Sequence, residues 1–335
     1  MTTALLKVED LHASFFTLSK TVRAVRGVSF KLYRGEALGV VGESGCGKST
    51  MAKSLIRLLP SISSRVDKGK IWYQGEDILL RSERGLRKIR GKEIGMVLQD
   101  PMTSLNPVMK IGAQIMEGYR EHYPNVHYRE VSLRALELLE CVGIPDAQLR
   151  MNQYPHELSG GMRQRVLIVI AMISSPKILV ADEPTMSLDV TIQAQLLELL
   201  KKIQRKEEMS ILLITHDLSI VANFCDRVLV MYAGEVIERA TVEMLFHAPK
   251  HPYTRRLLNS IPRLDLPSSR HLYSIHGSPP DLSCKLRGCG FYARCPHSMQ
   301  ICRDKRPKSI EVNQDHYVSC WLFRPPPHST SKDKK

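Results

Sequence analysis

A glycine-rich segment near the N-terminus limits the folds open to this chain more than any other feature. Residues 42–49 read Gly-Glu-Ser-Gly-Cys-Gly-Lys-Ser, with the apolar run 37–41 before them and helix-forming residues 51–59 after them. Strand, loop and helix in this order let backbone N–H groups and the positive end of the helix surround a phosphate. The segment therefore predicts a nucleotide-binding α/β fold with a parallel sheet.

Each residue of this loop has an expected part in nucleotide binding. Lys48 would neutralise oxygens of the β- and γ-phosphates, and the Ser49 hydroxyl would ligate Mg²⁺. Cys46 lies inside the loop, where we expect the backbone to bind rather than the thiol. The predicted ATP-binding residues here are Gly42, Ser44, Gly45, Cys46, Gly47, Lys48, Ser49 and Thr50.

Two carboxylates follow a second apolar run, at residues 177–181. Ligands of open α/β sheets bind beyond the carboxyl ends of the strands, which is where Asp182 and Glu183 stand. Asp182 would hold Mg²⁺ through water, and Glu183 would polarise the water that attacks the γ-phosphate. An acidic pair after a strand is as often a helix cap, but the phosphate-binding loop favours the catalytic role.

A third motif makes a family resemblance specific. Residues 158–165 read Leu-Ser-Gly-Gly-Met-Arg-Gln-Arg and lie between the two nucleotide motifs. In this order the three motifs resemble the ABC ATPase family, over about residues 4–245. The resemblance implies that Ser159, Gly160 and Gly161 form a second phosphate cradle at a helix N-terminus. In the family this cradle serves the ATP of the opposing subunit, so that a complete site needs two chains.

The same resemblance implies roles for single residues elsewhere. Gln99, after the strand-like residues 94–98, matches the glutamine that contacts Mg²⁺ and the attacking water. His216 matches the histidine that reaches the γ-phosphate, and Phe15 matches the aromatic residue that stacks on adenine, although Phe16 stands beside it. Residues 186–189, Met-Ser-Leu-Asp, stand where the family places the loop that crosses the dimer interface.

The predicted organisation follows from these motifs. We expect an α/β fold with an ABC-type P-loop ATPase core at residues 1–250, and a helical subdomain at about residues 100–175 inserted between the halves of a parallel sheet. Prolines, histidines and cysteines accumulate after residue 248, so a small Cys-rich C-terminal extension is placed at 251–325. The polar residues 326–335 predict a disordered tail.

Composition excludes some classes of protein and leaves others open. With 43% hydrophobic residues the chain can bury a core. The N-terminus lacks the pattern of a signal peptide, and the apolar run 166–173 is far shorter than the roughly 20 residues of a spanning helix. If the protein works at a membrane, we expect other chains to supply the spans.

Three short segments resemble one branch of the family, the oligopeptide and dipeptide importers, whose other members carry nickel or related cargo. They are residues 100–107, 154–157 and 251–254. The resemblance implies two membrane-spanning permease subunits, a second and homologous ATPase subunit, and an extracytoplasmic solute-binding protein. It also implies ATP and Mg²⁺ as cofactors, and a peripheral location on the cytoplasmic face of the bacterial inner membrane.

The C-terminal cysteines resemble the extension of the same branch, which in some members holds a [4Fe-4S] cluster. Four thiolates are the usual complement of such a cluster. Zinc would accept the same thiolates, and unligated or oxidised thiols remain a third alternative. Cys284 could substitute for any one of the four. The expected ligands are Cys289, Cys295, Cys302 and Cys320.

Two classes of function compete. In the first, the chain is a transport motor that couples ATP hydrolysis to the uptake of peptides, nickel or another small solute. In the second, it is a soluble ABC ATPase that acts on nucleic acid, which the net charge of +14 would suit. The chain has neither the long coiled-coil arms nor the second ATPase half of such relatives. Transport is therefore favoured, with no nucleic-acid partner.

Overall fold

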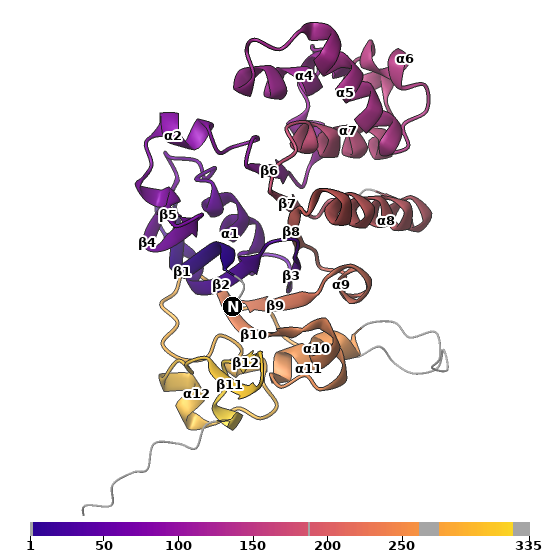
Figure 1. The fold of residues 1–335 in the computed structure, drawn as a ribbon. Helices are drawn as coiled ribbons and strands as arrows, with labels where there is room; N and C mark the ends of the chain where they lie inside the picture. Colours follow the sequence, from indigo (N-terminus) through magenta and orange to yellow (C-terminus); the bar gives the residue numbers. More distant parts are fainter. Residues whose placement is uncertain (1–2, 187, 261–274, 324–335) are drawn as a thin grey trace, which may run out of the picture.

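The computed structural model describes residues 3–186, 188–260 and 275–323 (Figure 1). A block of helices lies at one end of the molecule, two sheets lie in the middle, and the C-terminal residues lie at the other end (Figure 1). The predicted tail at 326–335 and Ser187 of the predicted interface loop lie outside the described residues. In the described part, no helix combines the length and the apolar character needed to cross a membrane.

An antiparallel sheet forms the N-terminal part. Its strand order is β2-β1-β4-β5. The first strand continues over 13 residues because irregularities in its pairing with β2 let it bend without ending, one of them at Asp10 with a φ of 46°. The strands are β1 (Ala4–Phe16), β2 (Thr21–Tyr33), β4 (Ser64–Tyr73) and β5 (Glu76–Asp77).

The second sheet has eight strands in the order β11-β12-β10-β9-β3-β8-β7-β6. The five strands from β9 to β6 are parallel, which confirms the predicted sheet. The strands are β3 (Ala37–Val41), β6 (Ile94–Val97), β7 (Ile178–Asp182), β8 (Ser210–Ile214), β9 (Arg227–Tyr232), β10 (Glu235–Thr241), β11 (Ile310–Asn313) and β12 (His316–Val318).

The helical block occupies the chain between β6 and β7. These two strands are neighbours at the edge of the sheet, so the block leaves from that edge. The sequence had led us to expect a block that separates two halves of the sheet, and the strand order differs from this expectation. Its elements are α3 (Pro101–Ser104), α4 (Ile111–His122), α5 (Tyr128–Cys141), α6 (Ala147–Met151), η2 (Pro155–Glu157) and α7 (Gly160–Met172).

The remaining helices connect strands or belong to the C-terminal part. The first of them begins at Lys48 and ends at Leu55, earlier than expected, because the loop leads straight into its first turn and Arg57 adopts a φ of 53°. They are α1 (Lys48–Leu55), η1 (Ile78–Leu80), α2 (Glu83–Arg87), α8 (Val190–Glu207), α9 (Leu218–Phe224), α10 (Val242–His247), α11 (Pro252–Asn259), η3 (Tyr292–Arg294), α12 (Gln300–Asp304) and η4 (Trp321–Phe323).

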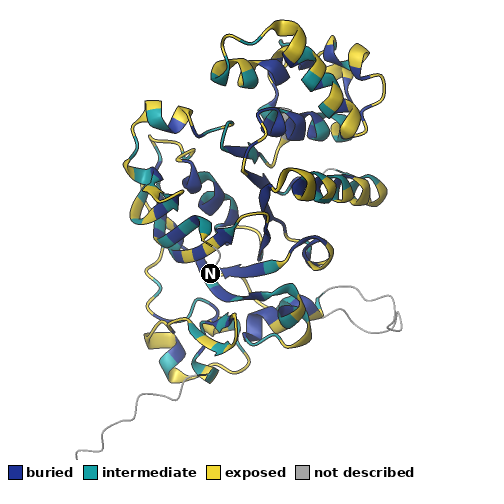
Figure 2. Cartoon of the chain, viewed as in Figure 1, coloured by how far each residue is buried: buried dark blue, intermediate teal, exposed yellow. Residues whose placement is uncertain are grey.

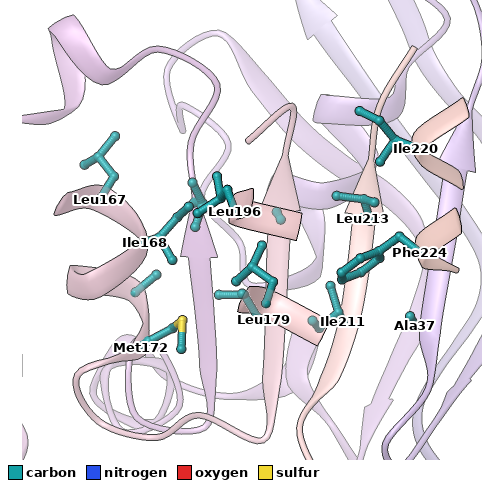
Figure 3. Packing of buried hydrophobic residues seen from close by; sticks show 14 of the residues in the cluster. Ala37, Leu167, Ile168, Met172, Leu179, Leu196, Ile211, Leu213, Ile220 and Phe224 are labelled. Carbon is teal, nitrogen blue, oxygen red and sulfur yellow. The ribbon is translucent and has the colours of Figure 1, made fainter. Parts of the chain in front are cut away.

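The five parallel strands of this sheet are almost entirely buried, as their dark blue colour in Figure 2 shows. Successive residues of one strand enter different cores: Leu179 packs on the side of α7, α8 and α9 (Figure 3), whereas Val180 packs on the side of α1 and the antiparallel sheet. Near-continuous apolar strands are what a parallel sheet covered on both faces requires. The rigid sheet thereby holds the loops at its carboxyl edge in place.

Candidate functional site

The predicted phosphate-binding loop connects β3 to α1. Its lysine is buried, and the Lys48 Nζ donates to the carbonyl oxygens of Gly42 (2.7 Å) and Glu43 (3.0 Å). Gly42 and Gly47 have φ values of 154° and 102°, and a Cβ at either would overlap a carbonyl oxygen of a neighbouring strand. Both positions therefore need glycine, and the loop packs closely against β2 and β9.

The other loop residues divide into an exposed tip and a buried base. Ser44 and Gly45 are exposed, whereas Cys46 is buried and Thr50 half-buried. Burial raises the pKa of the Cys46 thiol, against the opposing influence of Lys48. The thiol therefore stays protonated at neutral pH and packs in the core beneath the loop.

The predicted magnesium ligands meet between β7 and α1. The Ser49 hydroxyl donates to Oδ1 of Asp182 at 3.0 Å. Asp182 is fully buried, and its Oδ2 has no hydrogen-bond partner among the described residues. Burial raises the pKa of this carboxyl group, although the hydrogen bond from Ser49 acts in the opposite direction. A buried carboxylate oxygen left free beside a hydroxyl suits a hard cation such as Mg²⁺.

Two of the predicted catalytic residues contact the carboxylate of the third, Glu183. The Glu183 Oε2 lies 3.3 Å from Nδ1 of His216 and 3.5 Å from Nε2 of Gln99. These residues follow β7, β8 and β6, so three neighbouring strand ends supply the group. Glu183 has a φ of 50°, and its N–H donates to the carbonyl of Ile214 at 2.9 Å. A non-glycine residue held in this conformation is typical of functional sites.

The third sequence motif, residues 158–165, contains the start of α7 in the helical block. Ser159 caps this helix, its hydroxyl accepting from the N–H of Met162 at 3.3 Å. Ser159 and Gly160 are exposed, and Gly161 is half-buried. Figure 1 places α7 with the other helices of the block, apart from α1 and its loop. The two predicted phosphate-binding segments are therefore not brought together within one chain.

Phe15 and Phe16 lie on opposite faces of β1. Phe15 is half-buried opposite Val22 on β2, two residues before Ala24, whose carbonyl oxygen limits the space at Gly47. The Phe16 ring has the Arg65 guanidinium 4.9 Å from its centroid. Both side chains line a surface pocket that does not include Phe15. The arrangement favours Phe15 as the aromatic residue on the side of the phosphate-binding loop.

One loop residue has contacts that the sequence did not reveal. Glu43 forms an ion pair with Arg294 at 2.7 Å, and its N–H donates to the Tyr253 hydroxyl at 2.9 Å. Both partners come from beyond residue 250. The only hint in the sequence was the His-Pro-Tyr-Thr segment at 251–254, which carries the tyrosine but does not show what it contacts.

The four predicted cluster ligands gather in the C-terminal part. Burial raises the pKa of Cys289 to about 12 and of Cys320 to about 11, and Cys302 acts on both in the same direction. The Cys289 N–H donates to the carbonyl of Cys302 at 2.7 Å. Burial also raises the pKa of Cys295, and Cys302 acts in the same direction. Cys284 is exposed and lies 4.0 Å from an oxygen of Asp281 instead.

This gathering is not compact enough for a single ion. Among the described residues, no three His, Cys, Asp or Glu side chains form a group that could hold one metal ion. A tetrahedral zinc site needs its thiolates about 2.3 Å from a common centre, so the zinc alternative has no support here. The iron–sulfur cluster expected from the sequence likewise has no support from a ligand group in the described part of the chain.

Comparisons with known proteins agree with this geometry. The profile of the ABC transporter family matches residues 25–186, and that of the oligopeptide/dipeptide transporter C-terminal region matches residues 237–302. The oligopeptide transport ATP-binding protein OppD of Bacillus subtilis is 49% identical over 96% of this chain and 90% of its own length. The dipeptide transport ATP-binding protein DppD of the same organism is 50% identical over 95% and 94%.

A solved structure shares the fold of the ATPase core. The dimeric ATP-binding cassette MJ0796, bound to ADP and Pi, superposes with a TM-score of 0.65 and 26% identity, covering 71% of this chain and 98% of that one. The expected α/β cassette fold is thereby confirmed. The chain belongs to the ABC transporter family of ATP-binding proteins, and it carries the oligopeptide/dipeptide transporter C-terminal region.

Proposed function

We propose that this ABC-type ATPase powers the uptake of oligopeptides or dipeptides through a membrane transporter. The observation that carries the proposal is the match of residues 237–302 to the oligopeptide/dipeptide transporter C-terminal region, which begins within strand β10 of the ATPase sheet. OppD and DppD, with about half of their residues identical, are named for oligopeptide and dipeptide transport. Nickel or another small solute is the alternative cargo.

The roles of the site residues follow from their contacts. Lys48 would leave the carbonyls of Gly42 and Glu43 and neutralise phosphate oxygens of ATP. Ser49 and Asp182 would hold Mg²⁺, which supplies charge neutralisation at the β- and γ-phosphates when bound.

Around the γ-phosphate, Glu183 would accept a hydrogen bond from the attacking water. His216 orients the carboxylate of Glu183, and Gln99 contacts the same oxygen from the third strand end. Phe15 would stack on adenine.

The proposed assembly contains two ATPase subunits. Ser159, Gly160 and Gly161 would complete the site of a second, homologous subunit, because the start of α7 is exposed and a helix N-terminus attracts an anion. Two permease subunits and an extracytoplasmic solute-binding protein would complete the transporter. In this scheme residues 1–250 form the ATPase domain, the helical subdomain at about 100–175 faces the permeases, and residues 251–325 form the extension, at the cytoplasmic face of the membrane.

We also propose that Cys289, Cys295, Cys302 and Cys320 hold a [4Fe-4S] cluster. The support for this proposal is their thiol-only composition, since four thiolates are the usual complement of such a cluster. The test is anaerobic purification with iron, sulfide and zinc analysis. About four irons per chain are expected, with loss of iron in Cys302→Ser and no loss in Cys284→Ser. Iron-free protein would contradict the cluster without touching the ATPase assignment.

The ATPase role is tested with Glu183→Gln. This change should lower the hydrolysis rate by at least roughly a hundredfold and leave Mg²⁺–ATP binding intact, because only water activation is lost. Glu207→Gln, an exposed change at the end of α8, is the matched control. Unchanged hydrolysis in Glu183→Gln would overturn the site assignment.

The cargo is tested separately, in membrane vesicles that contain the assembled transporter. Labelled di- and oligopeptides should enter only with ATP and with an intact Lys48, since Lys48→Ala removes a phosphate-binding charge. Uptake of nickel in place of peptides would favour the alternative cargo. Stimulation of hydrolysis by nucleic acid, without uptake of either, would favour the soluble class of ABC ATPases.

A further inference from the structure

The phosphate-binding loop carries a negative charge that the C-terminal region neutralises. The Arg294 guanidinium donates to Oε2 of Glu43 at 2.7 Å, and the two side chains are only 7% and 22% exposed. The same guanidinium donates to the hydroxyl of Tyr232 at 3.0 Å and to the carbonyls of Ile275 (2.9 Å) and His276 (3.1 Å). Arg294 is thus held firmly at the end of η3, with one branch on the loop.

The backbone of Glu43 is held from the same side. Its N–H donates to the Tyr253 hydroxyl at 2.9 Å, and its carbonyl accepts from Lys48 Nζ at 3.0 Å. Tyr253 is fully buried, with ring centroids of Tyr232 at 4.6 Å and Phe291 at 5.4 Å. An aromatic cluster of Tyr232, Tyr253 and Phe291 therefore holds the backbone of Glu43, whose carbonyl accepts the hydrogen bond from Lys48.

The ion pair of Glu43 and Arg294 also affects the charge of the phosphate-binding loop. The loop receives a ligand that carries several negative charges, and Glu43 places another negative charge in the same eight-residue loop. A half-buried carboxylate without a partner would repel the phosphates, since Coulomb interactions are strong where water is partly excluded. With Arg294 in place, the pair is neutral overall, and the attraction of Lys48 for phosphate is not offset.

We propose that Arg294 is a positioning residue of the ATP site, which neutralises Glu43 and holds the phosphate-binding loop ready for nucleotide. The C-terminal extension is on this view a working part of the ATP site and not only an appendage. The inference rests on the proposed function as an ATPase, and it adds a residue more than 240 positions from the loop.

The test is ATP affinity of the full-length chain, measured with Mg²⁺ and a fluorescent ATP analogue. Arg294→Gln should weaken binding roughly tenfold, because the charge of Glu43 is left unpaired. The double variant Glu43→Gln/Arg294→Gln should recover most of that loss, with Glu43→Gln alone completing the cycle. If Arg294 only supported the fold, the double variant would bind as weakly as Arg294→Gln, and the inference would be wrong.

Two further variants separate charge from structure. Gln and Lys can each still donate to the carbonyls of Ile275 and His276, so neither change removes every contact of the extension. Arg294→Lys keeps the charge and should bind ATP more tightly than Arg294→Gln; equal weakness of the two would overturn the inference. Arg287→Ala, an exposed arginine of the same extension, should bind as the wild type does.

The kinetic readout is equally specific. Because Arg294 does not contact the group around Glu183, Arg294→Gln should raise the KM for ATP while kcat stays within about twofold. A fall in kcat with an unchanged KM would contradict a role in nucleotide positioning. Wild-type chain that bound no ATP would overturn the proposed function itself, whereas wild-type binding with an unaltered Arg294→Gln variant overturns this inference alone.

Discussion

Asp182 shows how a functional residue departs from the requirements of stability. It is fully buried, yet one of its oxygens has no hydrogen-bond partner in the described part of the chain. Burying an unpaired polar atom costs about 1–3 kcal/mol. Within the fold alone this carboxylate is unfavourable, and a bound cation would compensate it, which is the physical argument for its proposed role.

His251 gives a prediction for the dependence of stability on pH. It caps α11, its Nδ1 accepting from the N–H of Tyr253 at 3.1 Å. Burial lowers the pKa of His251 to about 4, although the charge of Glu238 acts to raise it. The unfolded chain therefore takes up a proton below its ordinary pKa of 6.5, while the folded chain does not. Stability from this group is present above pH 6.5 and falls as the pH drops towards 4.

The measurement is chemical denaturation of wild type and His251→Asn between pH 7.5 and 4.5. Asparagine keeps a capping acceptor but does not titrate, so the wild type should lose up to roughly 3 kcal/mol more than the variant over this range. The other titrating groups are common to both proteins and cancel in the comparison. Parallel pH profiles would show that His251 is not neutral in the folded protein.

At the scale of elements, β6 and α7 approach each other more closely than side chains would allow. A Cβ at Gly95 would overlap the carbonyl oxygen of Ala171 and crowd Pro176. Gly95→Ala must therefore push the helix from the sheet, and we expect a loss of about 1–3 kcal/mol in the free energy of unfolding. The strand β6 leads to Gln99, and Ser159 caps α7. The rate of ATP hydrolysis should therefore fall together with the stability.

The matched control lies in α4 of the same helical block. Gly118 has no atom within 4 Å of the place where a Cβ would stand. Gly118→Ala should therefore stabilise the protein by roughly 0.5–1 kcal/mol, since alanine is the better helix former. Equal effects of the two substitutions would mean that the close approach of β6 and α7 does not govern stability here.

At the scale of the whole molecule, a buried contact between a histidine and a glutamate attaches the C-terminal part. His316 on β12 lies 2.7 Å from Glu238 on β10, and both side chains are fully buried. The backbone N–H groups of Lys250 and His251 donate to the same carboxylate, at 2.6 and 2.8 Å. One glutamate therefore joins the ATPase sheet, the start of α11 and the extension.

Removing one partner of this contact should destabilise the fold. His316→Ala would leave one oxygen of the buried Glu238 without its hydrogen-bond partner, and we expect a loss of about 1–3 kcal/mol, measured by denaturant unfolding of the full-length chain. His247→Ala, at an exposed histidine of α10, should change stability by less than about 0.5 kcal/mol. Similar values for the two variants would show that the extension is not attached through this pair.

The motifs themselves could be predicted because they are local. A glycine loop between a strand and a helix, two carboxylates after an apolar strand and a capped glycine segment each depend on neighbouring residues. The sequence also predicted Asp182, Glu183, Gln99 and His216 at strand ends, and parallel strands necessarily bring their carboxyl ends to one edge. The contacts of Gln99 and His216 with Glu183, both within 3.5 Å, follow from that topology.

Only the tertiary structure decided the contacts between distant segments. Nothing local to Glu43 distinguishes a solvated carboxylate from one paired with Arg294, and no pattern in residues 310–318 shows that they extend the ATPase sheet. Likewise, the strand order places the helical block at an edge of the sheet, although the sequence order alone suggested its middle. Sequence patterns report backbone preference and burial, whereas the choice of a partner far along the chain depends on how all the elements pack together.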